Sequence, residues 1–249
     1  MNKPLRRIAI FCGLLVLALL VRDNWLQYVK ADHLAEHEMN RRVPIERYAQ
    51  PRGDIIVDGK AITGSQKVDG DDFKYKRTYK NGPMWSPVTG FASQRIGATQ
   101  IESIEDRILT GNDDRLFFRR SLDMLTGKKK EGGNVVTTLN RDAQKAAYDG
   151  LKNKGKGAVA AIDPSTGAIL ALASTPSYDP SKFAGNTNAE AETFGKLDKD
   201  SDKPMLNRAL RETYPPGSTF KVVTAAAAME HGLYTEIDEK TKSPLPWTM

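Results

Sequence analysis

The sequence predicts an α+β protein that is anchored to a membrane by its N-terminus and has a small β-rich region before a second domain. Three observations predict this fold class. An unbroken apolar run lies near the N-terminus, short β-type runs with turn signals follow it, and the second half contains an amphipathic helical run and an alanine-rich one. A length of 249 residues suits one domain of ordinary size and a smaller one.

Composition and charge narrow the class of protein only partly. With 39% hydrophobic and 27% charged residues, the chain has the composition of a globular protein and can build a sizeable core. Its formal net charge of +6 and pI near 9.2 favour anionic surroundings such as lipid head groups or acidic polymers, although the charge is too dispersed to identify a partner. Cys12 is the only cysteine, so no internal disulfide can form and the exported part depends on its core alone.

The first element is the apolar run Ile8–Val21, which predicts an uncleaved membrane anchor within residues 1–28. The run has 14 residues, fewer than the ~20 that usually span a bilayer, and in this respect is typical of a signal-peptide core. However, no small-residue cleavage site follows it, and Trp25 and Tyr28 stand where interfacial aromatic side chains are expected. The basic tail MNKPLRR predicts a cytoplasmic N-terminus, which makes the chain a single-pass protein of the cell membrane with its bulk outside.

The next segment, VKADHLAEHEMNRR, is charged and compatible with a helix, and it opens an extracytoplasmic N-terminal domain that we place at residues 29–127. His33, Glu36 and His37 match the H-x-x-E-H pattern of inverted zinc metallopeptidases, in which two histidines on one helix face hold zinc and the glutamate activates water. We favour a solvated juxtamembrane helix, because polar neighbours surround the motif where a catalytic helix needs packing on one side.

Strands are predicted next in this domain. RGDIIVDGKAITGS contains two β-type runs around the turn signal Asp58-Gly59, which is the pattern of a hairpin. DDFKYKRTYKNG alternates lysines with aromatic side chains and Arg77, which predicts a strand with one basic face. Such interleaving could bind single-stranded nucleic acid, but a solvated strand is favoured outside the membrane, and we expect no nucleic-acid partner. Residues 84–111 predict a mixed segment closed by a helix over about 100–109, without a catalytic grouping.

The cluster GKKKEGGN predicts a domain boundary, after which a second domain is expected over residues 134–249. It begins with a strand, an N-cap at Asn140 and an amphipathic helix, followed by two β-type runs around a turn at 164–167. A long polar loop is predicted over about 181–203. The chain then enters TYPPGSTFKVV and an alanine-rich helix that could be buried.

Ser218 and Lys221 in this last stretch are a candidate nucleophile and its base. A spacing of i and i+3 places both side chains on one helix face, and no other serine of the chain has a lysine at this spacing. Burial would lower the lysine pKa and provide a neutral amine to take the serine proton, while the helix N-terminus and the Ser218 backbone N–H favour a developing oxyanion. S-x-x-K alone is a weak motif, and the alternative is that Ser218 only caps the helix.

The wider pattern resembles the membrane-anchored class B penicillin-binding proteins of the penicillin-binding protein A type. The resemblance covers nearly the whole chain and rests on the anchor, on RGDIIVDGKAITGS, GFASQRIGATQIE and AVAAIDPSTGAILALASTPSYDPS, and above all on NRALRETYPPGSTFK. It implies a pedestal or dimerisation-type domain followed by the fold of the penicillin-recognising serine acyltransferases. It also implies that Ser218 is the acylated nucleophile and Lys221 its general base.

The activity implied by this resemblance is D,D-transpeptidation of peptidoglycan. The serine attacks a stem peptide, terminal D-alanine leaves, and an amine from a neighbouring strand resolves the acyl-enzyme into a crosslink. β-Lactam antibiotics would acylate the same serine, and no metal or organic cofactor is expected. The implied partners are peptidoglycan stem peptides, the membrane, and proteins of cell-wall synthesis or division.

The sequence departs from the family pattern after the nucleophile. The motifs S-x-N and K-T-G do not follow it, and Lys240-Thr241-Lys242 does not replace them, so we expect an N-terminal portion of a longer enzyme. The alternatives are a β-lactam sensor or hydrolase with the same serine and lysine, a zinc peptidase using His33 and His37, and a non-catalytic cell-wall scaffold. A hydrolase would turn over a β-lactam, a zinc peptidase would lose activity to a chelator, and a scaffold would tolerate Ser218→Ala.

Overall fold

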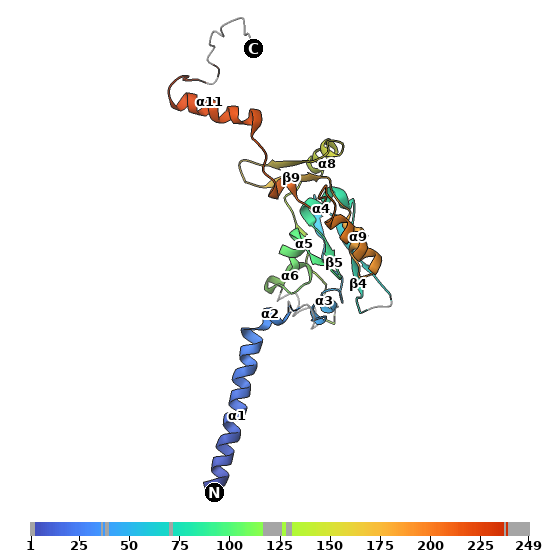
Figure 1. Ribbon diagram of the computed structural model, residues 1–249, viewed down its shortest axis with the longest axis vertical. Coiled ribbons are helices and arrows are strands. Elements are labelled where there is room, and N and C mark those ends of the chain that lie inside the picture. Colours follow the sequence, from blue (N-terminus) through green and yellow to red (C-terminus); the bar gives the residue numbers. More distant parts are fainter. Residues whose placement is uncertain are drawn as a thin grey trace. The chain divides into compact units, whose positions relative to one another are not determined.

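The computed structural model describes residues 3–35, 37, 40–69, 72–116, 126–127, 131–236 and 238. Glu36, the predicted boundary residues 128–130, and residues 240–242 therefore lie outside the described residues. The chain forms two compact units, Met1–Leu210 and Arg211–Met249. The first unit contains both helices and short strands, which confirms the predicted α+β class (Figure 1).

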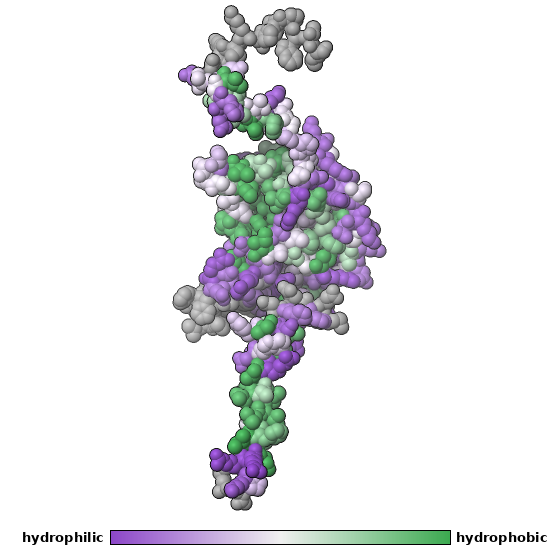
Figure 2. Space-filling model, turned by 60° about the vertical axis from the view of Figure 1, so that its left-hand side comes forward, coloured by the Kyte–Doolittle hydropathy of each residue, from purple (hydrophilic) through white to green (hydrophobic). Residues whose placement is uncertain are grey.

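The predicted anchor is a single long helix, α1 (Lys3–Tyr28), followed by the short helices α2 (Ala31–Ala35) and α3 (Arg42–Arg47). With 26 residues, α1 is about 39 Å long at 1.5 Å per residue, which exceeds the ~30 Å hydrocarbon core of a bilayer. It is longer than the apolar run because polar residues at both ends continue the helix. Figure 2 shows its exposed apolar side chains between hydrophilic ends. By length and composition, α1 is a candidate membrane span.

The predicted hairpin is confirmed. Strands β1 (Ile55–Val57) and β2 (Lys60–Ala61) pair antiparallel, and the turn residues Asp58 and Gly59 have φ angles of 48° and 68°. Positive φ at both central positions is the geometry of a type I′ turn, whose twist matches that of the flanking strands. The open side of β1 pairs in parallel with β7 (Val135–Val136), which gives a three-stranded sheet in the order β2-β1-β7.

A second pair consists of β3 (Thr63–Lys67) and β4 (Tyr75–Tyr79), so the strand predicted from DDFKYKRTYKNG is also confirmed. The segment after it forms helix α4 (Gly82–Thr89) and the short hairpin β5 (Ala92–Ser93) and β6 (Gly97–Ala98). The single helix predicted over about 100–109 is two short helices that break at Glu105. Their bounds are α5 (Gln100–Ile104) and α6 (Asp106–Leu109), and η1 (Asp114–Leu116) follows.

The next elements agree with the sequence. The Asn140 side chain accepts a hydrogen bond from the Ala143 N–H at 2.9 Å and so caps α8 (Arg141–Leu151), as predicted. Strands β8 (Gly157–Ile162) and β9 (Ile169–Thr175) pair antiparallel around the predicted turn. The buried Gln144 of α8 bonds both backbone groups of Leu172, so its amide takes the place of a strand along this stretch of β9.

The polar loop predicted over about 181–203 is wrong. It contains η2 (Pro180–Phe183) and an 11-residue helix, α9 (Asn188–Asp198). Thr187 and Glu190 form a capping box at the start of α9, which satisfies N–H groups that a helix N-terminus otherwise leaves unpaired. Phe194 and Leu197 then pack α9 against an aromatic cluster of Phe91, Tyr178 and Phe183. The pattern T-x-x-E was the sequence signal for this helix.

The interior of the first unit joins an apolar core to a buried ion-pair cluster that the sequence did not indicate. The apolar core includes Trp85 and the strand residues Ile55 and Val57. The ion-pair cluster consists of Arg52, Arg77, Glu102 and Asp106. Glu102 is fully buried and accepts hydrogen bonds from the Nε atoms of Arg77 and Arg52 at 2.6 and 3.0 Å.

The surroundings of this cluster shift the pKa of its members and neighbours. Burial lowers the pKa of Arg52, but the Glu102 and Asp106 carboxylates outweigh this effect, so the pKa lies above its ordinary value. Arg77 was predicted only as a member of a solvated strand, and it is instead buried against Glu102. Burial also raises the pKa of the adjacent Tyr48 to about 12.

Candidate active site

Ser218 lies at the N-terminal end of a helix in the second unit. The preceding Pro215 and Pro216 have no backbone N–H, and Gly217 has a φ of 53°, which a glycine adopts without steric cost. A 3₁₀ turn, η3 (Gly217–Thr219), then leads directly into the 11-residue helix α11 (Phe220–Glu230). The Pro-Pro-Gly corner therefore ends the extended segment, and the helical backbone begins at the serine.

The interpretation of Ser218 as a simple helix cap is wrong. The N-cap residue of α11 is Thr219, and its side chain makes no capping hydrogen bond. Ser218 and Lys221 are both exposed and stand three positions apart across the junction of η3 and α11. Side chains three apart in a 3₁₀ turn eclipse one another. This spacing is compatible with a serine and its base, and the catalytic roles of the two residues stay predictions.

Lys221 also borders a shallow groove on α11. The groove has a volume of about 430 Å³ and is formed by one face of the helix and the chain that follows it. It is lined by Lys221, Thr224, Ala225, Ala228, Met229, Tyr234 and Glu236. Apart from the half-buried Ala228, the side chains of α11 are exposed, in contrast to the packed helix that the alanine-rich sequence suggests.

The zinc interpretation of the juxtamembrane motif is not supported by the helix boundaries. Helix α2 ends at Ala35, so His33 and His37 do not share one continuous helix face. Both histidines are exposed, and Glu36 lies outside the described residues. Among the residues that the structure describes, no group of three or more His, Cys, Asp or Glu side chains is placed to hold a metal ion.

A second polar site, which the sequence did not predict, lies within the first unit around α4. Pro87 lies inside this helix and has no N–H, so the carbonyl of Pro83, four residues earlier, lacks its usual intrahelical partner. The Ser177 hydroxyl donates to this carbonyl at 2.6 Å and is itself bonded to the Ser86 hydroxyl at 2.8 Å. Because Ser177 gives its proton to Pro83, Ser86 is the donor between the two serines.

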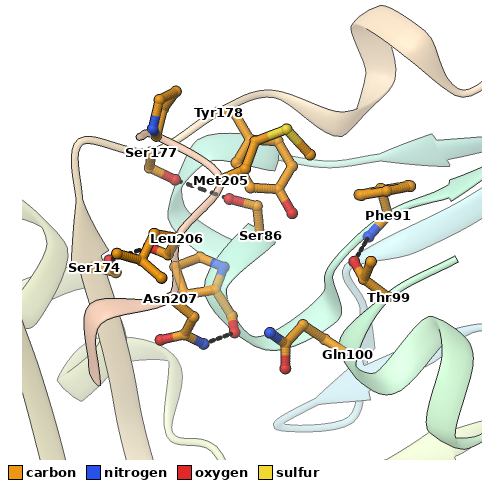
Figure 3. A pocket seen from close by; sticks show the side chains of 12 residues that line it. Ser86, Phe91, Thr99, Gln100, Ser174, Ser177, Tyr178, Met205, Leu206 and Asn207 are labelled. Carbon is orange, nitrogen blue, oxygen red and sulfur yellow. Dashed lines mark hydrogen bonds between the residues drawn. The ribbon is translucent and has the colours of Figure 1, made fainter. Parts of the chain in front are cut away.

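The same helix accepts two further side chains from later in the chain. The Pro87 carbonyl, near the C-terminal end of α4, accepts a 2.5 Å hydrogen bond from Asn207 Nδ2, and the Met84 carbonyl accepts one from Gln144 Nε2 at 2.9 Å. Figure 3 shows Asn207 beside Ser86, Ser177 and Gln100 around a small pocket of about 110 Å³. The Tyr178 hydroxyl bonds Thr99 at this pocket, and burial raises the pKa of this tyrosine to about 12.

Next to Asn207, the residue Arg208 is also buried and fixed by the backbone around it. Its N–H donates to the Ser174 hydroxyl at 3.1 Å, and its guanidinium donates to the carbonyls of Asp202 and Lys203 at 2.6 and 3.1 Å. Helix α10 (Arg208–Arg211) starts here, and the first unit ends within it at Leu210. The segment toward Ser218 therefore leaves the first unit from a firmly bonded position.

Comparison with known proteins relates these segments to one family. Residues 52–135 match the model of the penicillin binding protein A dimerisation domain, and residues 157–248 match that of the penicillin binding protein transpeptidase domain. The chain is 43% identical to the peptidoglycan D,D-transpeptidases PbpA of Mycolicibacterium smegmatis and Mycobacterium tuberculosis, over 99% and 98% of its length. It covers 51% and 50% of those proteins, so it spans about half the length of these curated relatives.

Solved structures give the same relationship. The ceftriaxone acyl-enzyme complex of penicillin-binding protein A from M. tuberculosis superposes with a TM-score of 0.72 at 46% identity, over 76% of this chain and 43% of that one. The chain belongs to the penicillin-binding protein family. Its α+β fold, with a segment of the transpeptidase domain after residue 157, is that of penicillin-binding protein A.

The junction around α4 has a defined place in this penicillin-binding protein. Pro83, Ser86 and Pro87 lie in the segment matched by the dimerisation-domain model, whereas Ser177 and Asn207 lie in the segment matched by the transpeptidase-domain model. The hydrogen bonds on α4 therefore connect the two segments. Sequence reasoning missed them because a proline inside a helix shows that a carbonyl is left without a partner but does not show which distant side chain fills it.

Proposed function

We propose that this chain carries the nucleophile of a peptidoglycan D,D-transpeptidase and that Ser218 is the residue acylated. The observation that carries the proposal is the 43% identity to PbpA transpeptidases over nearly the whole chain. The position of Ser218 at a helix N-terminus, three residues before Lys221, supports it. A helix N-terminus carries partial positive charge and unpaired N–H groups, which favour the negative charge that develops during acyl transfer.

The reaction proceeds in two steps that share one acyl-enzyme. Lys221 takes the Ser218 proton as the serine oxygen attacks the penultimate D-alanine carbonyl of a stem peptide, and this proton passes to the terminal D-alanine amine as that residue leaves. The ester then accepts attack by an amine of a neighbouring strand, which releases Ser218 and forms the crosslinking amide. The serine, the lysine and the helix N-terminus supply the nucleophile, the base and the electrostatic stabilisation.

The same chemistry defines the partners of the protein. β-Lactams acylate Ser218 because they present a strained amide to the same nucleophile. Acyl-enzyme complexes with ceftriaxone, imipenem and penicillin G are known for the M. tuberculosis relative, which supports this part of the proposal. Proteins of cell-wall synthesis or division are the expected protein partners.

The domain organisation follows from the same proposal. Residues 1–28 form a cytoplasmic tail and single-pass anchor, residues 29–127 an extracytoplasmic pedestal, and residues 134–249 the first part of the transpeptidase domain. The basic tail before the apolar run of α1 supports a cytoplasmic N-terminus. This orientation places Ser218 on the side of the membrane where peptidoglycan is built.

Labelling with fluorescent penicillin tests the proposal directly. The full-length gene product should form a covalent adduct, and Ser218→Ala should abolish it. Ser201→Ala, which changes another exposed serine at a turn, is the matched control and should label as the wild type does. Labelling that persists in Ser218→Ala would assign the nucleophile to another residue, and slow steady hydrolysis of the label would indicate a hydrolase.

A further inference from the structure

Asn207 and Arg208 are the last buried residues before the candidate nucleophile. Their exposed fractions are 5% and 2%, whereas every residue from Leu210 to Ala227 is exposed. The segment that leads to Ser218 therefore has its root at this pair. The position of any later residue in the segment depends on how firmly the root is held.

The root is held to a part of the chain that is 120 residues away in sequence. Asn207 Nδ2 bonds the Pro87 carbonyl, which lies among the last four carbonyls of α4 and has no partner within the helix. A side-chain amide that supplies a missing helix bond fixes both the distance and the direction between the two backbones. Asn207 thereby ties the start of the Ser218 segment to the dimerisation-type segment.

Asn207 differs in one respect from the other side chain that pairs with an orphan carbonyl of α4. Ser177 donates to Pro83 and also takes part in the bond with Ser86, so its hydroxyl is satisfied. The Oδ1 atom of Asn207 is buried and has no hydrogen-bond partner among the described residues. A buried acceptor without a partner is destabilising, so the gain from the Pro87 bond is offset within the same side chain.

We propose that Asn207 is a positioning residue for Ser218, whose amide fixes the root of the nucleophile segment against α4 and thereby sets the rate of acylation. The inference rests on the proposed acyl transfer at Ser218. Because its bonded and unbonded atoms offset each other, Asn207 contributes little to the stability of the fold. Its contribution is the geometry that it gives to the following residues.

A pair of substitutions separates positioning from stability. Asn207→Ala leaves the Pro87 carbonyl without a partner but also removes the unpaired Oδ1, so the melting temperature should change little. The maximal rate of acylation by fluorescent penicillin should fall by about 10- to 100-fold, because small displacements of a reacting group have effects of this size. The penicillin concentration that gives half-maximal rate should stay near the wild-type value.

Ser177→Ala is the matched control because it removes the other side-chain donor to an orphan carbonyl of α4. Here nothing offsets the loss, and the melting temperature should fall by about 2 to 8 °C. The acylation rate below the melting temperature should be that of the wild type. Equal acylation rates in Asn207→Ala and wild type, or equal losses in both variants, would overturn the proposal.

Hydrogen–deuterium exchange gives a readout that does not require acylation. In Asn207→Ala, the amides of residues 208–217 should exchange faster, while those of β8 and β9 keep the wild-type rates. Unchanged exchange over 208–217 would refute Asn207 as the anchor even if the wild type were never labelled by penicillin. Absence of labelling in the wild type would instead refute the proposed function. If Asn207→Ala does not fold, Asn207→Ser provides the smaller perturbation for both measurements.

Discussion

Replacing Glu102 by glutamine should strongly destabilise the first unit. The carboxylate is fully buried, and it accepts from the Nε atoms of two arginines whose side chains are also almost completely buried. Glutamine keeps the size of the side chain but removes its charge and presents an NH₂ group to one of the two guanidinium donors. The substitution thus leaves two positive charges in the interior without their shared negative partner.

The magnitude follows from what remains beside each arginine. Arg52 keeps Asp106 at 2.7 Å, whereas Arg77 keeps only Asp54, at 3.8 Å, in addition to bonds with backbone carbonyls. Breaking a buried ion pair by removing one member typically costs about 3 to 5 kcal/mol, because the other charge stays buried. In a unit of this size, such a loss corresponds to a melting temperature lower by about 6 to 20 °C.

Thermal unfolding followed by circular dichroism, at equal protein concentration, measures this effect. Glu105→Gln is the matched control, because its carboxylate is partly exposed and lies 3.8 Å from the exposed Arg115. Partly exposed pairs of this kind contribute about 0 to 1 kcal/mol. A melting temperature for Glu102→Gln that equals that of Glu105→Gln would refute the view that the buried cluster holds this region together.

Two further substitutions test particular contacts of the fold. The pKa of Tyr48 is raised by burial from 10.0 to about 12, so the unfolded chain loses this proton first and stability falls as pH rises above 10. Tyr48→Phe should reduce this alkaline loss and, because the hydroxyl has no partner among the described residues, raise stability at pH 7 by about 1 kcal/mol in urea unfolding; a loss at pH 7 would mean that the hydroxyl is bonded. Thr187→Ala should cost about 1 kcal/mol and speed amide exchange at the start of α9, and unchanged exchange there would argue against the capping box.

Features with short-range signals were predictable from the sequence. The Asp58-Gly59 turn needs two residues with positive φ, and the Asn140 cap needs one oxygen next to a helix start, so neither depends on distant parts of the chain. The same is true of Ser218, whose place at the start of a helix follows from the Pro-Pro-Gly corner. The capping box of α9 was equally local, but the polar composition of 181–203 concealed it.

Features made by distant pairs were not predictable. Glu102 bonds arginines that lie 25 and 50 residues away, and Arg77 stands in an alternating strand pattern that is typical of a solvated face. Only the folded backbone brings these charges together. The zinc motif failed for the opposite reason, since its spacing assumes a helix that ends at Ala35 before the second histidine.

The segments matched by the two domain models meet in one compact unit because two sets of close backbone contacts join them. At the first, Gly132 and Gly133 follow the predicted boundary cluster, and a Cβ atom on Gly132 would lie 2.0 Å from the Leu109 carbonyl oxygen and 2.2 Å from the Gly53 nitrogen. Strand β7 then pairs in parallel with β1, so the chain adds a strand to the first sheet before it enters the transpeptidase segment.

At the second set of contacts, donors from the transpeptidase segment and α8 fill carbonyls of α4 that Pro87 and the helix end leave unpaired. A glycine contact admits no side chain, and a hydrogen bond to an orphan carbonyl has a fixed direction, so both joints resist relative rotation of the segments. A flexible linker would require neither. The dimerisation-type segment can therefore orient the root of the Ser218 segment, as the proposed role of Asn207 requires.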